Sequence, residues 1–388
     1  MANNNENKIL NVPNLRFPEF SGEWSSQPLT DFMNFKNGLN PDAKRFGRGT
    51  KFISVMDILN NQYICYDNIR ASVELQDGDI ETYGVDYGDI LFQRSSETLE
   101  DVGRANVYLD SKPAIFGGFV IRGKSKGNYN PLFFRYLLAS PTARKRIIVK
   151  GAGAQHFNIG QDGLSKVSLD IPRLSEQEKI GKLLQCVDAR IATQNKIIED
   201  LKKLKSAIYQ KLFSNLQGEE KFLSELAEIV KGQQINGSEL SESGKYYVMN
   251  GGIIPSGYYD SYNTEAETIS ISEGGNSCGY VQYNNSKFWS GGHCYTLCIK
   301  TTAPISTLFL FHFLKWREND IMALRIGSGL PNIQKKDLSK VSIVVPTSAV
   351  QQQLTALFSA FQIKIETEEN IAISLDKQKQ YLLLQMFI

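Results

Sequence analysis

The chain has 388 residues, of which 41% are hydrophobic and 22% are charged, a composition typical of a folded protein with room for two or three hydrophobic cores. Its formal net charge of +2 excludes a uniformly basic chain, so any nucleic-acid surface must come from local clusters of Lys and Arg. The five cysteines are scattered, no apolar leader opens the sequence and no apolar run approaches the length of a membrane span, so we expect a cytoplasmic protein without a membrane contact.

The first part of the chain predicts a mixed α+β domain. Short runs rich in β-forming residues alternate with Gly, Asn and Asp, which favour turns. We assign residues 1–172 to this first domain. Its predicted strands lie in residues 51–58, 87–94, 105–109 and 114–122.

A long amphipathic helix is predicted next, over residues 173–217. Its apolar residues recur at alternating spacings of four and three, as in the a/d seam of a coiled coil, and this pattern favours pairing with another helix over packing on its own domain. The seam consists of Ile180, Leu184, Val187, Ile191, Gln194, Ile198, Leu201, Lys205, Ile208 and Leu212.

The second half of the chain repeats the first at a constant offset of 174 positions, as from Asn158 to Asn332. Self-similarity over this length indicates a tandem duplication. We therefore expect a second domain over residues 218–346 and a second helix over residues 347–388. The repeated residues are Asn158-Ile159 and Asn332-Ile333, residues 164–168 and 338–342, Gly117-Gly118 and Gly291-Gly292, and Pro172 and Pro346.

The second helix carries the same kind of seam, with Leu354, Phe358, Phe361, Ile365, Glu368, Ala372, Leu375, Lys379, Leu382 and Met386. Two such helices in one chain can pair antiparallel, and each would be about 55 to 60 Å long. We predict an α+β fold: two mixed α/β domains, related by internal duplication and separated by two long helices that form an antiparallel coiled coil. Because polar seam residues can fix a register, we also expect Lys205 to face Glu368.

The common motifs of enzyme active sites are missing from the sequence. There is no glycine-rich phosphate loop, no Gly-x-Ser-x-Gly elbow and no His-Glu-x-x-His zinc motif. His293, Cys294 and Cys298, with Cys278 nearby, resemble metal ligands, but they fall on a predicted strand whose side chains alternate between two faces. We therefore predict buried thiols, no metal site and no catalytic residue.

Local basic clusters are candidates for binding phosphate, because each neutralised phosphate releases counterions. Residues 43–51 and 135–150 each hold several basic residues and no acidic one, although a solvated protein face explains either cluster equally well. Polar loops supply donors and acceptors for base edges, or are simply turns. The candidate DNA-binding residues are Lys44, Arg45, Arg48, Lys51, Arg94, Arg104, Arg144, Lys145, Arg146, Lys150, Lys245, Tyr246, Asn250, Ser272, Asn276, Lys335 and Lys336.

Two segments, together with the duplicated plan of domain and helix, resemble the specificity subunit of type I restriction-modification systems. One is Asn-Leu-Arg-Phe-Pro-Glu-Phe at residues 14–20, followed by Gly-Glu-Trp at residues 22–24. The other is Ile-Pro-Arg-Leu-Ser-Glu-Gln-Glu-Lys-Ile at residues 171–180, at the head of the first helix. The resemblance covers nearly the whole chain.

The resemblance implies two target recognition domains, each of which reads one half of a split asymmetric site in double-stranded DNA. It implies that two modification subunits with S-adenosylmethionine, and restriction subunits with ATP and Mg²⁺, assemble on this chain, which itself has no cofactor and does no chemistry. The coiled-coil and subunit interface then comprises Glu176, Gln177, Ile180, Leu184, Val187, Ile191, Ile198, Leu201, Ile208, Leu212, Gln351, Leu354, Phe358, Phe361, Ile365, Leu375, Leu382 and Met386.

The second helix departs from the pattern of the first, because Val350 stands before Gln351 where the first helix has Glu176. Two other functions are alternatives to that of a DNA specificity subunit. A stand-alone adenine methyltransferase needs an Asp/Asn-Pro-Pro-Tyr/Phe motif, and the chain has no Pro-Pro dipeptide. A non-catalytic coiled-coil interaction protein without a DNA role explains the helices, but not two diverged mixed domains with basic clusters.

Overall fold

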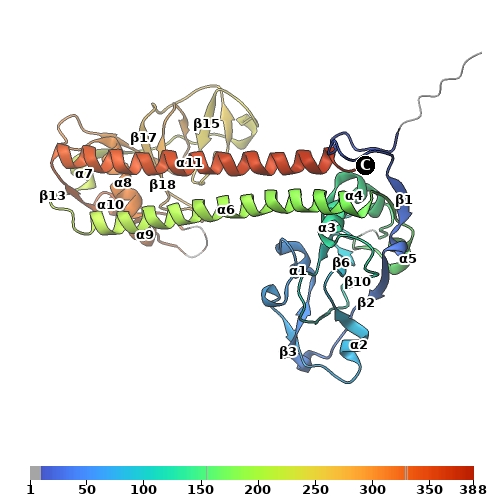
Figure 1. Ribbon diagram of the computed structural model, residues 1–388. Helices are drawn as coiled ribbons and strands as arrows, with labels where there is room; N and C mark the ends of the chain where they lie inside the picture. Colours follow the sequence, from blue (N-terminus) through green and yellow to red (C-terminus); the bar gives the residue numbers. More distant parts are fainter. Residues whose placement is uncertain (1–9, 154, 328, 330) are drawn as a thin grey trace, which may run out of the picture. The chain divides into compact units, whose positions relative to one another are not determined.

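The structure is a computed structural model that describes residues 10–153, 155–327, 329 and 331–388. The chain divides into two compact units, which we call unit 1 and unit 2 (Figure 1). Unit 1 comprises Met1–Asn195 and Asn370–Ile388, and unit 2 comprises Lys196–Glu369. Each unit therefore combines one mixed domain with a part of both long helices, α6 (Leu174–Phe213) and α11 (Ser348–Gln385).

Unit 1 is built around an antiparallel sheet with the strand order β2-β10-β6-β8. A second sheet, β4-β3-β9-β5, contains a parallel pair of β3 with β9. Its strands are β1 (Ser25–Pro28), β2 (Met33–Asn37), β3 (Phe46–Ile53), β4 (Ser72–Val73), β5 (Gly84–Val85), β6 (Ile90–Gln93), β7 (Ser95–Ser96), β8 (Ala105–Val107), β9 (Ala114–Phe116), β10 (Val120–Ser125), β11 (Phe157–Asn158) and β12 (Ser168–Ile171). Its helices besides the long ones are α1 (Val55–Asn60), α2 (Asp79–Tyr83), α3 (Pro131–Ala139), α4 (Pro141–Ile148) and α5 (Gln161–Ser165), with 3-10 turns at Leu29–Asp31, Ala43–Arg45 and Tyr66–Asn68.

Unit 2 repeats the main features of this plan with fewer strands. Its main sheet has the order β14-β20-β17-β18, β15 pairs parallel with β19, and β13 pairs with β21 as β1 pairs with β12. This agreement confirms the predicted internal duplication. The elements are β13 (Glu219–Phe222), α7 (Leu223–Leu226), β14 (Ala227–Lys231), a 3-10 turn (Gly237–Glu239), β15 (Tyr246–Met249), β16 (Gly257–Tyr259), β17 (Thr268–Ser272), β18 (Val281–Asn284), β19 (Trp289–Ser290), β20 (Cys294–Ile299), α8 (Thr307–Trp316), α9 (Glu318–Ala323), α10 (Lys335–Leu338) and β21 (Ser342–Val345).

The strand predicted over residues 51–58 was wrong in its second half. Strand β3 ends at Ile53, and α1 begins at Val55. The reason is local, because the Asp57 carboxylate accepts hydrogen bonds of 2.7 Å from the backbone N–H and the hydroxyl of Ser54. This capping box starts a helix where β-branched residues suggested a strand.

A buried glutamine fixes the head of each long helix to the neighbouring domain. Gln177 Oε1 accepts from the backbone N–H of Asn130, the N-cap of α3, at 3.0 Å, and its amide donates to the Pro172 carbonyl at 2.9 Å. In unit 2, Gln351 makes the equivalent bonds to the backbone N–H of Ser306, the N-cap of α8, and to the Pro346 carbonyl. Because both amide ends are used, a substitution at Gln177 leaves two backbone groups without this partner. A substitution at Gln351 leaves three, since its amide also donates to the Pro304 carbonyl at 2.8 Å.

Glu176 has a partner that unit 2 lacks, which explains why its glutamate is not repeated. The side chain is 2% exposed, and its two oxygens accept from Arg16 Nε and Nη2, both at 2.8 Å. Arg16 lies in the segment before β1, whereas in unit 2 the chain passes from α6 to β13 through residues 214–218 alone. Without an arginine a buried carboxylate would be costly, and the partly buried Val350 packs on the core at this position instead.

The two long helices run antiparallel within each unit. In unit 2, Lys202 pairs with Glu369 at 2.6 Å, Lys205 donates to Gln362 at 2.7 Å, and the rings of Tyr209 and Phe358 lie 3.9 Å apart, so numbers rise along one helix as they fall along the other. In unit 1, Lys379 of α11 pairs with Asp188 of α6 at 2.6 Å.

The expected pairing of Lys205 with Glu368 was wrong. Lys205 donates a hydrogen bond to Gln362, and Glu368 forms an ion pair with Lys364 on its own helix. The seam positions named above are all buried or half-buried. Near the end of α6, however, Tyr209 and Phe213 are more deeply buried than their predicted neighbours Ile208 and Leu212, because α8 also packs on this part of the helix.

Candidate nucleic-acid interface

Each unit contains the same tight backbone corner, formed where a pair of glycines joins two strands. In unit 1, Gly117 and Gly118 lie between β9 and β10, and the Gly38 N–H donates to the Val120 carbonyl at 3.2 Å. In unit 2, Gly291 and its neighbour lie between β19 and β20, and the Gly232 N–H donates to the Cys294 carbonyl at 2.8 Å. We call these the unit 1 corner and the unit 2 corner.

Backbone hydrogen bonds establish which residues are equivalent at the two corners. The Arg94 N–H donates to the Phe119 carbonyl at 2.9 Å, and the Glu273 N–H donates to the His293 carbonyl at the same distance. The carbonyls of Arg94 and Glu273 accept in turn from the N–H groups that follow Asn158 and Asn332. Arg94 therefore corresponds to Glu273, and Phe119 corresponds to His293.

Glycine is required at the corners because two backbone segments cross at close range. A Cβ atom on Gly38 would fall on the carbonyl oxygen of Gly117, and one on Gly232 would fall on that of Gly291, closer than the 3.0 Å below which real Cβ contacts essentially never occur. A Cβ on Gly118 would fall on the Asn40 side chain, which covers the glycine pair, just as Gln234 covers it in unit 2.

We expect Gly232→Ala to destabilise unit 2 by about 1–3 kcal/mol, since the added methyl group must displace the backbone. Gly237→Ala is the matched control: it lies in the same unit, and a Cβ there would have no atom within 4 Å. Urea denaturation of the full chain measures both. Equal stability of the two variants would show that the crossing is not as tight as the structure indicates.

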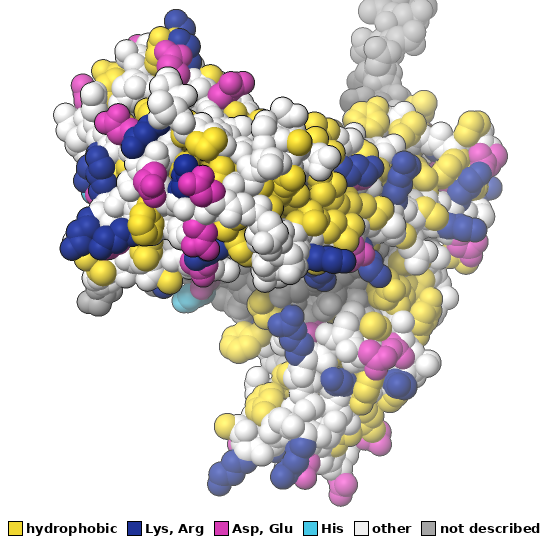
Figure 2. All heavy atoms as spheres, turned by 90° about the vertical axis from the view of Figure 1, so that its left-hand side faces the viewer, with side chains coloured by type: hydrophobic (Ala, Val, Ile, Leu, Met, Phe, Trp, Pro, Cys, Tyr) yellow, Lys and Arg dark blue, Asp and Glu magenta, His cyan; other side chains and the backbone are white. Residues whose placement is uncertain are grey.

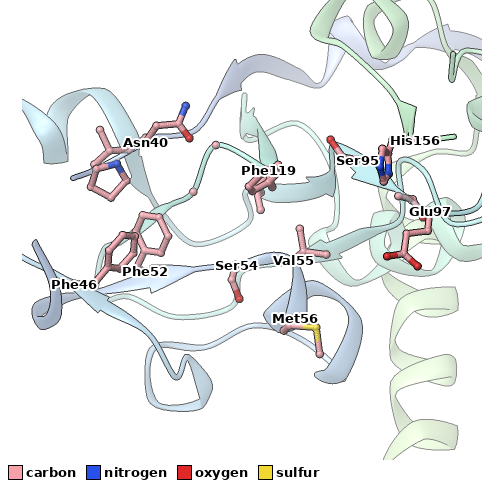
Figure 3. Close-up of a pocket in the computed structure, with 16 residues that line it drawn as sticks. Asn40, Phe46, Phe52, Ser54, Val55, Met56, Ser95, Glu97, Phe119 and His156 are labelled. Carbon is pink, nitrogen blue, oxygen red and sulfur yellow. The ribbon is translucent and has the colours of Figure 1, made fainter. Parts of the chain in front are cut away.

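The unit 1 corner borders an open apolar groove of about 550 Å³ (Figure 3). Phe119 lies in the middle of the groove, with Phe46 and Phe52 at one end. Ser95, Glu97 and His156 line the other end, and Asn40 lies above the aromatic end. The groove can therefore take an apolar group in its centre and hydrogen-bonding groups at its ends.

The unit 2 corner carries polar side chains on the same frame. The Glu273 carboxylate is buried, and its Oε1 accepts from Lys231 at 2.7 Å and from the Tyr295 hydroxyl at 3.0 Å. The other oxygen, Oε2, lies 3.9 Å from His293 Nδ1. The backbone N–H of His293 donates to the Asn250 side chain at 3.0 Å. This corner therefore presents an exposed imidazole held over a charged network.

The structure brings only some of the candidate DNA-binding residues to the corners. Arg94 donates to the Gly118 carbonyl at 3.3 Å, Asn250 holds the His293 backbone, and the Ser272 hydroxyl donates to the Gly251 carbonyl at 2.7 Å. The sequence did not single out Asn40, Phe119 or Gln234. It considered Glu273 only as part of a polar loop, and His293 only as a metal ligand. The repeated glycine pair was the signal that could have located them.

Most of the other basic candidates bind groups of their own unit. Arg144 donates to the carbonyls of Glu100 and Val102 at 2.8 and 2.7 Å, and burial lowers its pKa to about 10. The remaining pairs are Arg45 with Asp79, Arg48 with Glu74, Lys51 with the Ile69 carbonyl, Arg104 with Asp101, and Arg146 with Asp170. Lys245 lies over the Tyr246 ring at 5.2 Å. The exposed candidates are Lys44, Arg48, Arg104, Lys145, Lys150, Lys245, Asn276, Lys335 and Lys336.

The basic residues form no broad field on the face shown in Figure 2. As far as its described residues are drawn, Lys and Arg side chains lie beside Asp and Glu side chains over this face. On this face, phosphate contacts, which need positive charge, therefore have individual exposed basic side chains available rather than one extended basic surface.

The cysteines and histidines of the second domain are not gathered into a metal site. Cys294 is buried, and burial raises the pKa of its thiol to about 11, while Cys298 and His293 are exposed. Within the residues that the structure describes, no group of three or more His, Cys, Asp and Glu side chains is placed to hold a metal ion. In the same part of the chain, no helix is long and apolar enough to cross a membrane.

Comparison with known proteins gives a consistent result. A family model described as the type I restriction modification DNA specificity domain matches the chain twice, over residues 21–203 and 217–377. A type I restriction enzyme specificity subunit of Methanocaldococcus jannaschii is 24% identical over 94% of this chain and 93% of its own length. A type I specificity subunit of Mycoplasma pneumoniae is 35% identical over 40% of this chain and 42% of its own length.

Two solved structures share the fold. The S subunit of a type I restriction-modification system from M. genitalium aligns with a TM-score of 0.63 and 20% identity over 97% of this chain and 99% of that one. A chain from a structure of the type I R-M system aligns with a TM-score of 0.61 and 13% identity, over 93% of this chain and 96% of that one. With two matches of the family model over most of its length, the chain belongs to the type I restriction-modification specificity subunits, whose role is DNA sequence specificity.

Proposed function

We propose that this chain reads a bipartite, asymmetric sequence in double-stranded DNA, with one unit at each half-site. The observation that carries the proposal is the pair of corners, which place different exposed side chains on the same backbone frame. A repeated frame suits two similar recognition events, because phosphate contacts position a protein while side chains at base edges specify the sequence. Phe119 in one unit and His293 in the other suit two half-sites of different sequence.

In this proposal the chain does no chemistry and instead assembles partners. Two modification subunits bind it and carry S-adenosylmethionine for methylation of adenine N6, and restriction subunits with ATP and Mg²⁺ complete a cytoplasmic complex. The long helices offer surface for such partners, because α11 exposes large apolar side chains, which are unusual on a free surface. These are Leu357, Ile363, Ile371, Ile373, Tyr381 and Leu384.

The decisive experiment maps methylated adenines in DNA that the complex of this chain with its modification subunits has modified. We expect one split motif with two dissimilar halves, and no methyl transfer by the chain alone. A continuous or palindromic motif would contradict the bipartite reading by two different units. Methylation by the chain without partners would contradict its non-catalytic role.

A coiled-coil protein without a DNA role remains the competing function, and salt distinguishes it. Gel shifts of the complex on a duplex with the mapped motif should weaken steeply as salt rises, because phosphate contacts release counterions. A duplex with a scrambled motif serves as the control. Equal binding to both duplexes would favour the competing function.

A further inference from the structure

Phe119 and His293 combine a fixed backbone with an exposed side chain. The backbone of each is held by the neighbouring strand, through the N–H of Arg94 or Glu273, and the residue that follows each bonds to Gly38 or Gly232. Yet Phe119 is 69% exposed, and the His293 side chain is 62% exposed. An exposed aromatic side chain with few rotatable bonds on a fixed backbone loses little conformational entropy on binding, which suits it to recognition.

The surroundings of Phe119 fit an apolar partner. The exposed side chains of Phe46 and Met56 share its groove, and no Lys or Arg is among the described residues that line it. A phosphate is therefore a poor occupant. In the major groove of DNA the apolar group that a base presents is the C5-methyl group of thymine, and Phe is one of the residues suited to contact it.

The surroundings of His293 fit a polar partner instead. Glu273 Oε2 is buried, has no hydrogen-bond partner among the described residues, and lies 3.9 Å from His293 Nδ1. This distance is too long for a hydrogen bond, but the negative charge of the carboxylate favours an N–H on Nδ1, which leaves the other ring nitrogen for a partner. A base edge with hydrogen-bonding groups satisfies that nitrogen, whereas a methyl group does not.

We propose that Phe119 and His293 are the specificity-determining residues at equivalent positions of the two units. Phe119 reads the methyl group of a thymine in one half-site, and His293 reads a base edge in the other half-site by a hydrogen bond. This inference rests on the proposed function, and Glu273 acts in it as a positioning residue.

The test compares the methylated motifs of the complex that contains the wild-type chain, Phe119→Ala, Phe119→Leu or His293→Ala. Phe119→Ala should cost about fivefold of the preference for thymine at one position of one half-site and leave the other half-site unchanged. Phe119→Leu keeps an apolar contact and should retain most of the preference. His293→Ala should relax one position of the other half-site.

A second arm removes the methyl group from the DNA instead. Replacing the thymine by deoxyuridine should weaken binding of the wild-type complex about fivefold, and should leave binding of the Phe119→Ala complex nearly unchanged. Thermal unfolding checks that the variants are folded, which we expect because both side chains are exposed.

Three outcomes would overturn the inference: unchanged motifs, uniform weakening at every position, or relaxation of the same half-site by Phe119→Ala and His293→Ala. Uniform weakening would indicate phosphate contacts. These failures differ from failure of the proposed function, since in that case the wild-type complex itself would give no split motif.

Discussion

Replacement of Asp188 by Ala is expected to lower the free energy of unfolding of unit 1 by about 3–5 kcal/mol, because it leaves buried charges without their partner. Asp188 lies on α6 and is 5% exposed. Its carboxylate forms ion pairs with Lys379 of α11 at 2.6 Å and with Arg135 at 3.2 Å, and it accepts a hydrogen bond from the Tyr136 hydroxyl at 2.8 Å. One carboxylate thus joins both long helices and α3.

Unit 2 supplies a matched control for Asp188. The duplication places Gln362 where unit 1 has Asp188 and Lys205 where unit 1 has Lys379, and these two are also in contact, at 2.7 Å. Because Gln362 is neutral and exposed, Gln362→Ala removes only its hydrogen bonds with Lys205 and Glu366 and should cost about 1 kcal/mol. Denaturant unfolding of the full chain, followed separately for each unit, measures both losses. Equal losses would show that the charge of Asp188 contributes nothing beyond a hydrogen bond.

The Asp188 network should also fail in acid. Burial raises the pKa of the carboxyl, but the hydrogen bond and charge of Lys379, with those of Tyr136 and Arg135, bring the pKa below its ordinary value. A folded-state pKa below that of the unfolded chain gives stability that is present above the unfolded pKa, about 3.9, and is lost as the pH falls through the folded pKa. The network therefore remains intact throughout the neutral range.

Unit 2 is expected to lose about 2 kcal/mol of stability between pH 7 and pH 5 through His312. This side chain occupies in α8 the place of Tyr136 in α3, is 4% exposed, and shares a hydrogen bond of 2.6 Å with the Tyr209 hydroxyl. Burial, with a smaller effect from Lys205, lowers its pKa from 6.5 to about 4. Since the unfolded chain binds the proton first, stability is complete above pH 6.5 and declines as the pH falls toward 4.

Unfolding of the full chain at pH 7 and pH 5 measures this loss, with His312→Gln as the variant that should remove most of it. His293→Gln is the control, because that histidine belongs to the same unit but is exposed. The unfolding transitions of the two units should therefore move apart on mild acidification, because unit 2 loses stability through His312 and unit 1 does not contain this histidine. An identical pH dependence in the wild-type chain and His312→Gln would contradict the assignment.

The sequence predicted the fold best where the same pattern occurs twice along the chain. The offset from Asn158 to Asn332 predicted the duplication, which matching sheet orders confirm. Sequence spacing could not predict which residues face each other across the helices, because side chains from outside the helices take part. Tyr209 is buried against α8, and Lys205 meets Gln362 rather than Glu368.

The corners show the same limit at the candidate site. The repeated glycine pairs were visible in the sequence, but the need for glycine depends on the close approach of Gly38 to Gly117, which lies about 80 residues away between two other strands. Basic residues such as Arg144 were nominated because they are charged, whereas the structure uses that guanidinium to bind two carbonyl groups of its own domain. The sequence shows where basic residues lie along the chain, but not which groups they bind in the fold.

Unit 1 is assembled from two separate segments of the chain, and this has a consequence for its folding during synthesis. Unit 2 is one continuous segment, Lys196–Glu369, whereas the core of unit 1 includes Met386 and Phe387, and the Leu15 N–H donates to the Gln385 carbonyl at 2.9 Å. At ribosomal rates of about 5–20 residues per second, residues 196–388 take about 10–40 s to make. Throughout that time Asp188 lacks Lys379, so the domain that is translated first is the one that is completed last.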